Sequence, residues 1–420
     1  MKIRILTVGT RGDVQPFVAL GGRLVQCGHE VTICTAVNFK EFVESNGVSF
    51  SPVRVDFLEL TQSEKGKKMM GGSPLEIFKN MKTLIFPMME RMLEDLWEAS
   101  KDAEVLIYSP KAFGGYDIAE KLKIPVFLAH PIPIIAPTTL FTNPALPFSI
   151  NNGFLNKISY KANSLIMASF FNIINKWRKE TLGLKNKRTL FTNDLVIDGK
   201  LIPIIYGCSP TVIPFDNNWG SNVSMEGFWF LEDKEWEPPK ELVRFLERGI
   251  SPIAIGFSSM PLNNPLSVKR MFVEALERTG QRGIFISGWS GIKETEKNDN
   301  IFVIDSIPHS WLFPKTRGII HHGGAGTTAA ALQAGKPMLI CPFSGDQPFW
   351  ATQMKKIGVA TFPLKENDMS VETFIDRIKE LLNNKRLRDT AESIAIKINS
   401  EKGIEKTIKF IHEKIVMSNK

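Results

Sequence analysis

The first 36 residues constrain the fold more than any other part of this 420-residue chain. An apolar run, Ile3 to Val8, leads into a glycine-containing loop, and a helical pattern then precedes a second apolar run, Val31 to Cys34. Strand, glycine loop, helix and strand in this order make a βαβ unit, whose loop lies at the carboxyl end of the first strand. The segment therefore predicts an α/β domain built on a parallel sheet.

A second block of the same kind follows later in the chain, and the length alone predicts two or three domains. Apolar runs separated by helical periodicity predict strands at Val105–Tyr108, Pro125–Ala129, Ile253–Phe257, Ile284–Ser287, Ile301–Ile304, Gly318–His321 and Met338–Cys341. We therefore expect two Rossmann-like, doubly wound α/β domains that face a central cleft.

The expected boundaries follow from periodicity and composition. They are residues 1–208 for the first domain, 209–239 for a linker, 240–395 for the second domain and 396–420 for a helical tail. The linker is rich in Pro, Asn, Trp and Gly and lacks periodicity. One face of the last helix carries Ile404, Ile408, Ile411 and Ile415, so we expect this helix to dock on the N-terminal domain.

Composition narrows the class of partner. The net charge of +8 suits an anionic small molecule, an acidic membrane surface or a nucleic acid. The basic residues form no stripe interleaved with aromatic residues, so no nucleic acid partner is expected. The excess of 29 Phe over 4 Tyr indicates either a large core or a pocket for an apolar ligand.

The sequence also predicts a cytoplasmic location. The four cysteines form no C-x-x-C pair, and the apolar run at the N-terminus is too short for a signal-peptide core. The most apolar long stretch, Ile124 to Phe141, contains four prolines, which exclude a regular membrane-spanning helix.

The strongest chemical signal is the sequence HHGGAGTT at 321–328, between a short strand and an alanine-rich helix. Glycines there let the backbone approach a ligand, and the free N–H groups and dipole at a helix start favour phosphate. The candidate phosphate-binding residues are His322, Gly324, Gly326 and Thr327. The alternative is a capped core helix that follows a tight turn.

Two further loops support this site. Asp346 and Gln347 follow the next predicted strand and could grip vicinal hydroxyls, although Asp and Gln before a helix are often only an N-cap. Ser259 follows the first strand of the second domain and could touch phosphate or ribose, or simply form a turn. A phosphate site beside a polyol clamp suggests a nucleotide sugar.

The loop GTRGDVQP at 9–16 lacks the third glycine of a dinucleotide-binding fingerprint. It places Asp13 at the start of a helix, facing the expected cleft. The alternative is that Asp13 only caps the helix that Pro16 helps to start.

These loops resemble those of family 1 nucleotide-sugar glycosyltransferases of the GT-B fold, above all sterol 3β-glucosyltransferases and glycopeptide-antibiotic glycosyltransferases. The resemblance implies inverting transfer of a hexose, by preference glucose from UDP-glucose, with Asp13 as the catalytic residue. It assigns His322, Gly324, Thr327 and Ser259 to the diphosphate and Asp346 and Gln347 to the sugar. Relatives from plants stack the nucleobase on a tryptophan where this chain has Ser306, so the base would contact groups near Ile307, which leaves UDP and dTDP open.

The resemblance and the apolar residues of Pro131–Phe148 and Leu75–Trp97 together favour a lipophilic acceptor such as a sterol, terpenoid or polyketide. No cofactor and no metal are expected, because the chain contains no D-x-D motif. The three lysines beside two methionines at 65–70 are typical of a solvated loop, and the alternative is weak peripheral contact with an acidic membrane surface. The alternative functions are a nucleotide-sugar epimerase of the same fold and a non-catalytic nucleotide-sugar-binding module.

Overall fold

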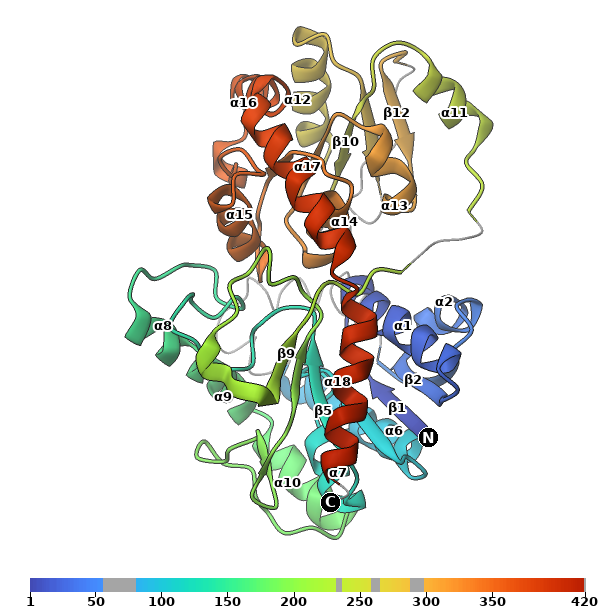
Figure 1. Cartoon of the computed structure of the whole chain (residues 1–420), viewed down its shortest axis with the longest axis vertical. Helices are drawn as coiled ribbons and strands as arrows, with labels where there is room; N and C mark the ends of the chain where they lie inside the picture. The colour runs from blue at the N-terminus through green and yellow to red at the C-terminus, as the bar shows by residue number, and fades with distance from the viewer. Residues whose placement is uncertain (56–80, 232–235, 258–264, 288–297, 419–420) are drawn as a thin grey trace.

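The computed structural model describes residues 1–55, 81–231, 236–257, 265–287 and 298–418. Within them the chain forms two parallel sheets, each covered by helices and stacked one above the other in Figure 1. The order of the first sheet is β3-β2-β1-β4-β5-β8-β9 and that of the second is β12-β11-β10-β13-β14. In both sheets the chain reverses its direction of travel beside the first strand, which is where open α/β sheets bind their ligands.

The strands of the first sheet are β1 (Lys2–Leu6), β2 (Glu30–Ala36), β3 (Ser49–Val53), β4 (Val105–Tyr108), β5 (Val126–His130), β8 (Ile204–Tyr206) and β9 (Val223–Met225). A small hairpin is formed by β6 (Val196–Ile197) and β7 (Lys200–Leu201). The second sheet contains β10 (Ile253–Gly256), β11 (Gly283–Ile286), β12 (Ile301–Ile304), β13 (Gly318–His321) and β14 (Met338–Ile340).

The helices of the first half are α1 (Arg11–Gln26), α2 (Lys40–Ser45), α6 (Phe86–Ser100), α7 (Gly115–Leu122), α8 (Gly153–Ser159), α9 (Lys161–Ala168) and α10 (Phe171–Glu180). Those of the second half are α11 (Lys240–Glu247), α12 (Pro265–Arg278), α13 (His309–Leu312), α14 (Ala325–Gln333), α15 (Gln347–Lys356), α16 (Val371–Asn383), α17 (Lys385–Ser400) and α18 (Gly403–Ser418).

The terminal helix returns to the first domain, as its apolar face predicts. Figure 1 shows α17 on the upper domain and α18 running down beside β9 of the lower one. Ile408 and Ile411 join the core around Ile3 of β1. The Trp229 indole N–H also donates to Thr407 Oγ1 at 3.0 Å. Burial of this apolar face thus ties the end of the chain to the first sheet.

Two features differ from the expected boundaries. The segment 209–239, expected to be a linker, contains β9, which pairs with β8 and so extends the first sheet. The helix α17 runs past residue 396 to Ser400 and packs against α14 of the second domain. A three-residue strand such as β9 shows too little periodicity to be recognised in a sequence. The boundary after residue 395 was misplaced because the apolar pattern of α17 continues up to Lys402 and Gly403, where α18 begins.

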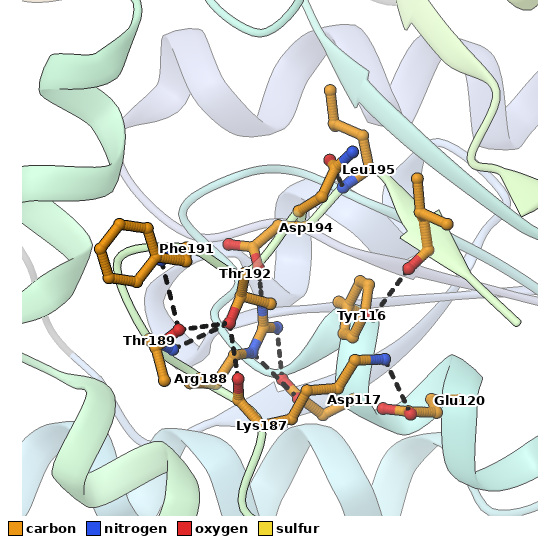
Figure 2. A network of polar contacts seen from close by, with 12 residues as sticks. Tyr116, Asp117, Glu120, Lys187, Arg188, Thr189, Phe191, Thr192, Asp194 and Leu195 are labelled. Carbon is orange, nitrogen blue, oxygen red and sulfur yellow. Dashed lines mark hydrogen bonds and ion pairs between the residues drawn. The ribbon is translucent and has the colours of Figure 1, made fainter. Parts of the chain in front are cut away.

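A buried ionic network supports the lower end of the first domain. Figure 2 shows Asp117 of α7 facing Arg188, which also reaches Asp194. Arg188 Nη2 donates to Asp117 Oδ2 at 2.7 Å, and Arg178 of α10 donates to the other carboxylate oxygen. The network joins α7, α10 and the segment that leads to the β6–β7 hairpin.

Candidate active site

Three polar side chains of the first domain gather at the carboxyl ends of neighbouring strands. Asp13 follows β1, Lys111 follows β4 and His130 ends β5, and these strands lie side by side in the sheet. The Lys111 ammonium donates to Asp13 Oδ1 at 2.7 Å. The side chain of Asp13 keeps 14% of its exposure, so the carboxylate is largely shielded while still accessible.

The second carboxylate oxygen of Asp13 is hydrogen-bonded to the nearby backbone. Oδ2 accepts from the Thr10 N–H at 2.9 Å, which completes a capping box at the start of α1. The capping role is therefore real and coexists with the contact to Lys111. Gly9 makes this close approach possible: its φ is +139°, and a Cβ there would lie 2.2 Å from Asp13 Oδ2.

Charge determines the protonation state of Asp13. Burial favours the neutral acid, but the Lys111 ammonium, with help from His130 and the Thr10 N–H, outweighs burial and lowers the pKa of Asp13. The pKa of Lys111 is correspondingly raised: burial lowers it, but attraction to Asp13 and Asp346 is stronger. The two groups thus form an ion pair at neutral pH.

His130 is a neutral residue behind this pair. Burial, together with the charge of Lys111, lowers the pKa of His130 to about 4. Its Nδ1 lies 3.1 Å from the Ile132 N–H, whereas its buried Nε2 has no hydrogen-bond partner among the described residues.

In the second domain, Gly323 and Gly324 shape the turn between β13 and α14. Gly323 has a φ of +93°, and Gly324 is the N-cap of α14. A Cβ on Gly324 would lie 2.5 Å from His322 Nε2, so the imidazole rests directly against this backbone. A Cβ on Gly326 would meet nothing within 4 Å, so the first turn of α14 has open space at this residue, as an anion site requires.

His322 is buried and electrically neutral. Burial lowers its pKa to about 4, which the nearby backbone of Gly256 offsets only in part. The ring lies beside the start of α14 with its Nε2 toward Gly324, and among the described residues its Nδ1 has no side-chain partner.

Asp346 and Gln347 lie at the start of α15. Asp346 is the N-cap residue, but its side chain caps no N–H and instead accepts from the Trp350 indole N–H at 2.9 Å. Gln347 uses its carboxamide oxygen to hold its own loop, accepting from the N–H groups of Phe343 at 2.7 Å and Ser344 at 3.1 Å. Asp346 is thus free to meet a ligand through its other oxygen, and Gln347 through its amide nitrogen.

The Lys111 ammonium attracts a carboxylate from each of the two domains. Its charge acts on Asp13 of the first domain and on Asp346 of the second, so both carboxylates lie near one ammonium group. Burial raises the pKa of Asp346 to about 6, against the lowering effects of its own backbone N–H, of Lys111 and of Trp350. The catalytic and sugar-binding candidates of the sequence therefore come together across the domain boundary.

The remaining candidates are placed less centrally. Gly326 is exposed and Thr327 half-buried in the first turn of α14, while Thr328 is engaged by the Gly324 carbonyl at 2.9 Å. Ser306 is exposed and Ile307 is buried after β12. Ser259 and residues 65–70 lie outside the described residues.

The sequence reasoning missed Lys111 and His130. Neither belongs to a motif, but Lys111 follows the predicted strand that neighbours β1, and His130 ends the next strand of the sheet. The rule that ligands bind at the carboxyl ends of parallel strands could have identified them. In the described residues no three potential metal ligands cluster, and no described helix could cross a bilayer.

Two family models and several curated relatives that match this sequence describe glycosyltransferases or related biosynthetic proteins. Residues 3–140 match the glycosyltransferase family 28 N-terminal domain, and residues 291–407 match the erythromycin biosynthesis protein CIII-like C-terminal domain. Sterol 3-beta-glucosyltransferases UGT80A2 and UGT80B1 of Arabidopsis thaliana are 38% and 34% identical over 97% and 98% of this chain. A sterol 3-beta-glucosyltransferase of Saccharomyces cerevisiae is 34% identical over 99% of it.

The chain spans 65% and 68% of the two plant proteins and 35% of the yeast protein. Among solved structures, the glycotransferase of kitacinnamycin superposes with a TM-score of 0.73 at 16% identity, covering 99% of both chains. The calicheamicin glycosyltransferase CalG4 gives a TM-score of 0.71 at 15% identity, covering 99% of this chain and 98% of its own. These two likenesses establish the fold.

Proposed function

The chain belongs to the family of GT-B glycosyltransferases that includes the sterol 3-beta-glucosyltransferases, and we propose that it transfers glucose from UDP-glucose to a hydroxyl of a lipophilic, sterol-type acceptor with inversion. The observation that carries this proposal is the ion pair of Asp13 with Lys111, whose ammonium is also attracted to Asp346 of the second domain. Inversion requires an acceptor oxygen opposite the leaving phosphate. Asp13 would serve that oxygen, while Asp346 would hold the sugar.

The low pKa of Asp13 constrains how it acts. A carboxylate paired with Lys111 is a weak base for a free alcohol, so it first accepts a hydrogen bond from the acceptor hydroxyl and orients its oxygen. It takes the proton as the bond to the anomeric carbon forms and the hydroxyl becomes acidic. The start of α14 and the neutral His322 would stabilise the departing diphosphate.

Incubation with UDP-glucose and a panel of sterols, terpenoid alcohols and polyketides, read by mass spectrometry, tests the proposal. We expect a product heavier by one hexose and release of UDP. Conversion of UDP-glucose to another UDP-sugar without acceptor would instead indicate an epimerase. Tight UDP-glucose binding with no product from any acceptor would indicate a binding module. A parallel series with dTDP-glucose decides the base.

Replacing His322 with alanine is expected to weaken UDP binding about 10- to 100-fold, because a hydrogen bond to a charged group contributes about 1.5–3 kcal/mol. Titration calorimetry measures the change. His29→Ala is the matched control, since His29 pairs with His412 of α18 at 2.9 Å, far along the chain from the loop. Equal affinities of the parent protein and the His322 variant would refute the phosphate-binding role.

The donor KM is expected to depend on pH through Asp346. Because its pKa is raised to about 6, the carboxyl is protonated below that pH and accepts fewer hydrogen bonds from sugar hydroxyls. We expect the KM for UDP-glucose to fall as the pH rises through about 6. Asp346→Asn should give a higher KM that no longer changes over this range. A parent profile flat across this range would contradict the assignment.

A further inference from the structure

The helices α8 and α9 present an apolar surface to solvent. Figure 1 shows α8 at the outer left edge of the lower domain and α9 below it. No residue of α9 is buried, and Leu165 and Ile166 are 65% and 59% exposed. We call α8, α9 and the loop before them the α8–α9 surface; its exposed large apolar side chains are Leu140, Phe148, Phe154, Leu155, Ile158, Leu165 and Ile166.

Hydrogen bonds on the inner side of α8 and α9 fasten the two helices to the loop before them. Buried Asn156 accepts from Thr142 Oγ1 at 2.7 Å, and Asn163 Nδ2 donates to the Ile134 carbonyl at 2.7 Å. The Tyr160 hydroxyl donates to the Pro133 carbonyl at 3.2 Å. An ordinary surface helix turns its apolar face to the core and its polar face to water, and here the arrangement is inverted. Large apolar side chains exposed together on two successive helices and the loop before them indicate a binding face.

The segment of chain that forms this surface carries charged side chains of one sign. The sequence contains no Asp or Glu from residue 121 to residue 179. Lys157 of α8 and Lys161 of α9 are exposed beside the apolar side chains, and neither has an acidic partner among the described residues. The surface therefore combines apolar side chains with unneutralised positive charge.

We propose that the α8–α9 surface docks on an anionic lipid bilayer. Apolar side chains enter the interface between headgroups and acyl chains, while lysines beside them meet acidic headgroups. A second copy of the chain suits the surface less well, because a symmetric dimer would bring the lysines of both copies together without an acidic residue to neutralise them.

The surface is also continuous with the site. The loop that begins after His130 at the end of β5 leads directly to α8, and the bonds from Tyr160 and Asn163 fasten both helices to that loop. If the proposed function holds, docking places the acceptor side of the site beside the membrane that contains the lipophilic acceptor. Docking itself requires no catalysis and can be tested without it.

Flotation of the full chain with vesicles tests the proposal. The probes are phosphatidylcholine vesicles and vesicles of phosphatidylcholine mixed with phosphatidylglycerol. We expect binding to the anionic vesicles that weakens as salt is raised. The double variant Leu165→Ser with Ile166→Ser should bind about tenfold less or weaker still. The variant Lys157→Gln with Lys161→Gln should lose about tenfold on anionic vesicles only.

Matched controls lie elsewhere on the chain. Ile396 of α17 is 73% exposed, and Ile396→Ser should leave vesicle binding unchanged. All variants should transfer glucose to a detergent-dispersed acceptor as the parent does, which separates failure of docking from failure of the proposed function. Failure of the parent to float, equal loss in Ile396→Ser, or a dimer in solution that the Leu165 and Ile166 variant dissociates would each overturn the proposal.

Discussion

Replacing Asp13 with asparagine is expected to lower kcat for glucosyl transfer about 10²- to 10⁴-fold, the range that a positioned general base contributes. Asparagine keeps an oxygen that can accept from the Thr10 N–H, so the start of α1 should persist. What it loses is the negative charge that, in the proposed mechanism, takes the proton of the acceptor hydroxyl. UDP binding should be unchanged, because His322 and α14 belong to the other domain. Steady-state kinetics and calorimetry with UDP measure the two quantities.

Asp13→Ala makes the comparison sharper. It removes the cap as well, at a cost of about 0.5–2 kcal/mol in stability, yet should lower kcat no further than asparagine does. If alanine were far worse than asparagine, the side chain would act mainly through the structure of α1. Transfer at the parent rate by either variant would refute the catalytic role.

The strands show how much of the fold the sequence could predict. Val105–Tyr108, Ile301–Ile304 and Gly318–His321 are observed with the predicted bounds. A parallel strand covered on both faces is a short apolar run between polar turns, which a sequence displays directly. The strand β9 was missed because its pairing with β8 depends on a chain path that brings residue 223 beside residue 204.

The site divides in the same way. Asp13, His322 and Asp346 could be chosen as candidates from the sequence because each lies in a loop that contains glycines or begins a helix. Lys111 belongs to no motif, and in the sequence only its place after a predicted strand distinguishes it from the other lysines of the chain. Its importance arises from a contact with Asp13, 98 residues away, and from its attraction to Asp346 of the other domain.

The ionic network around Asp117 is the clearest example of a feature that the sequence pattern could not predict. Asp117, Arg178 and Arg188 lie in three separate segments with no shared motif, yet all are buried. Arg188 Nε also donates to Asp117 Oδ1 at 3.1 Å, so one carboxylate serves two guanidinium groups. A charged side chain is rarely fully buried without such pairing. The network therefore depends on its single fully buried acid.

Replacing Asp117 with asparagine is expected to lower the free energy of unfolding by about 3–5 kcal/mol, the cost of leaving a buried charge without its partner. Asparagine has the same shape, so the loss reports charge and not packing. Urea denaturation measures it. Glu372→Gln, which breaks an exposed contact with Arg278 at 3.2 Å, is the control and should leave stability nearly unchanged, because exposed ion pairs contribute little. Equal effects of the two substitutions would mean that Glu120 and Asp194, which also contact these arginines, already neutralise them.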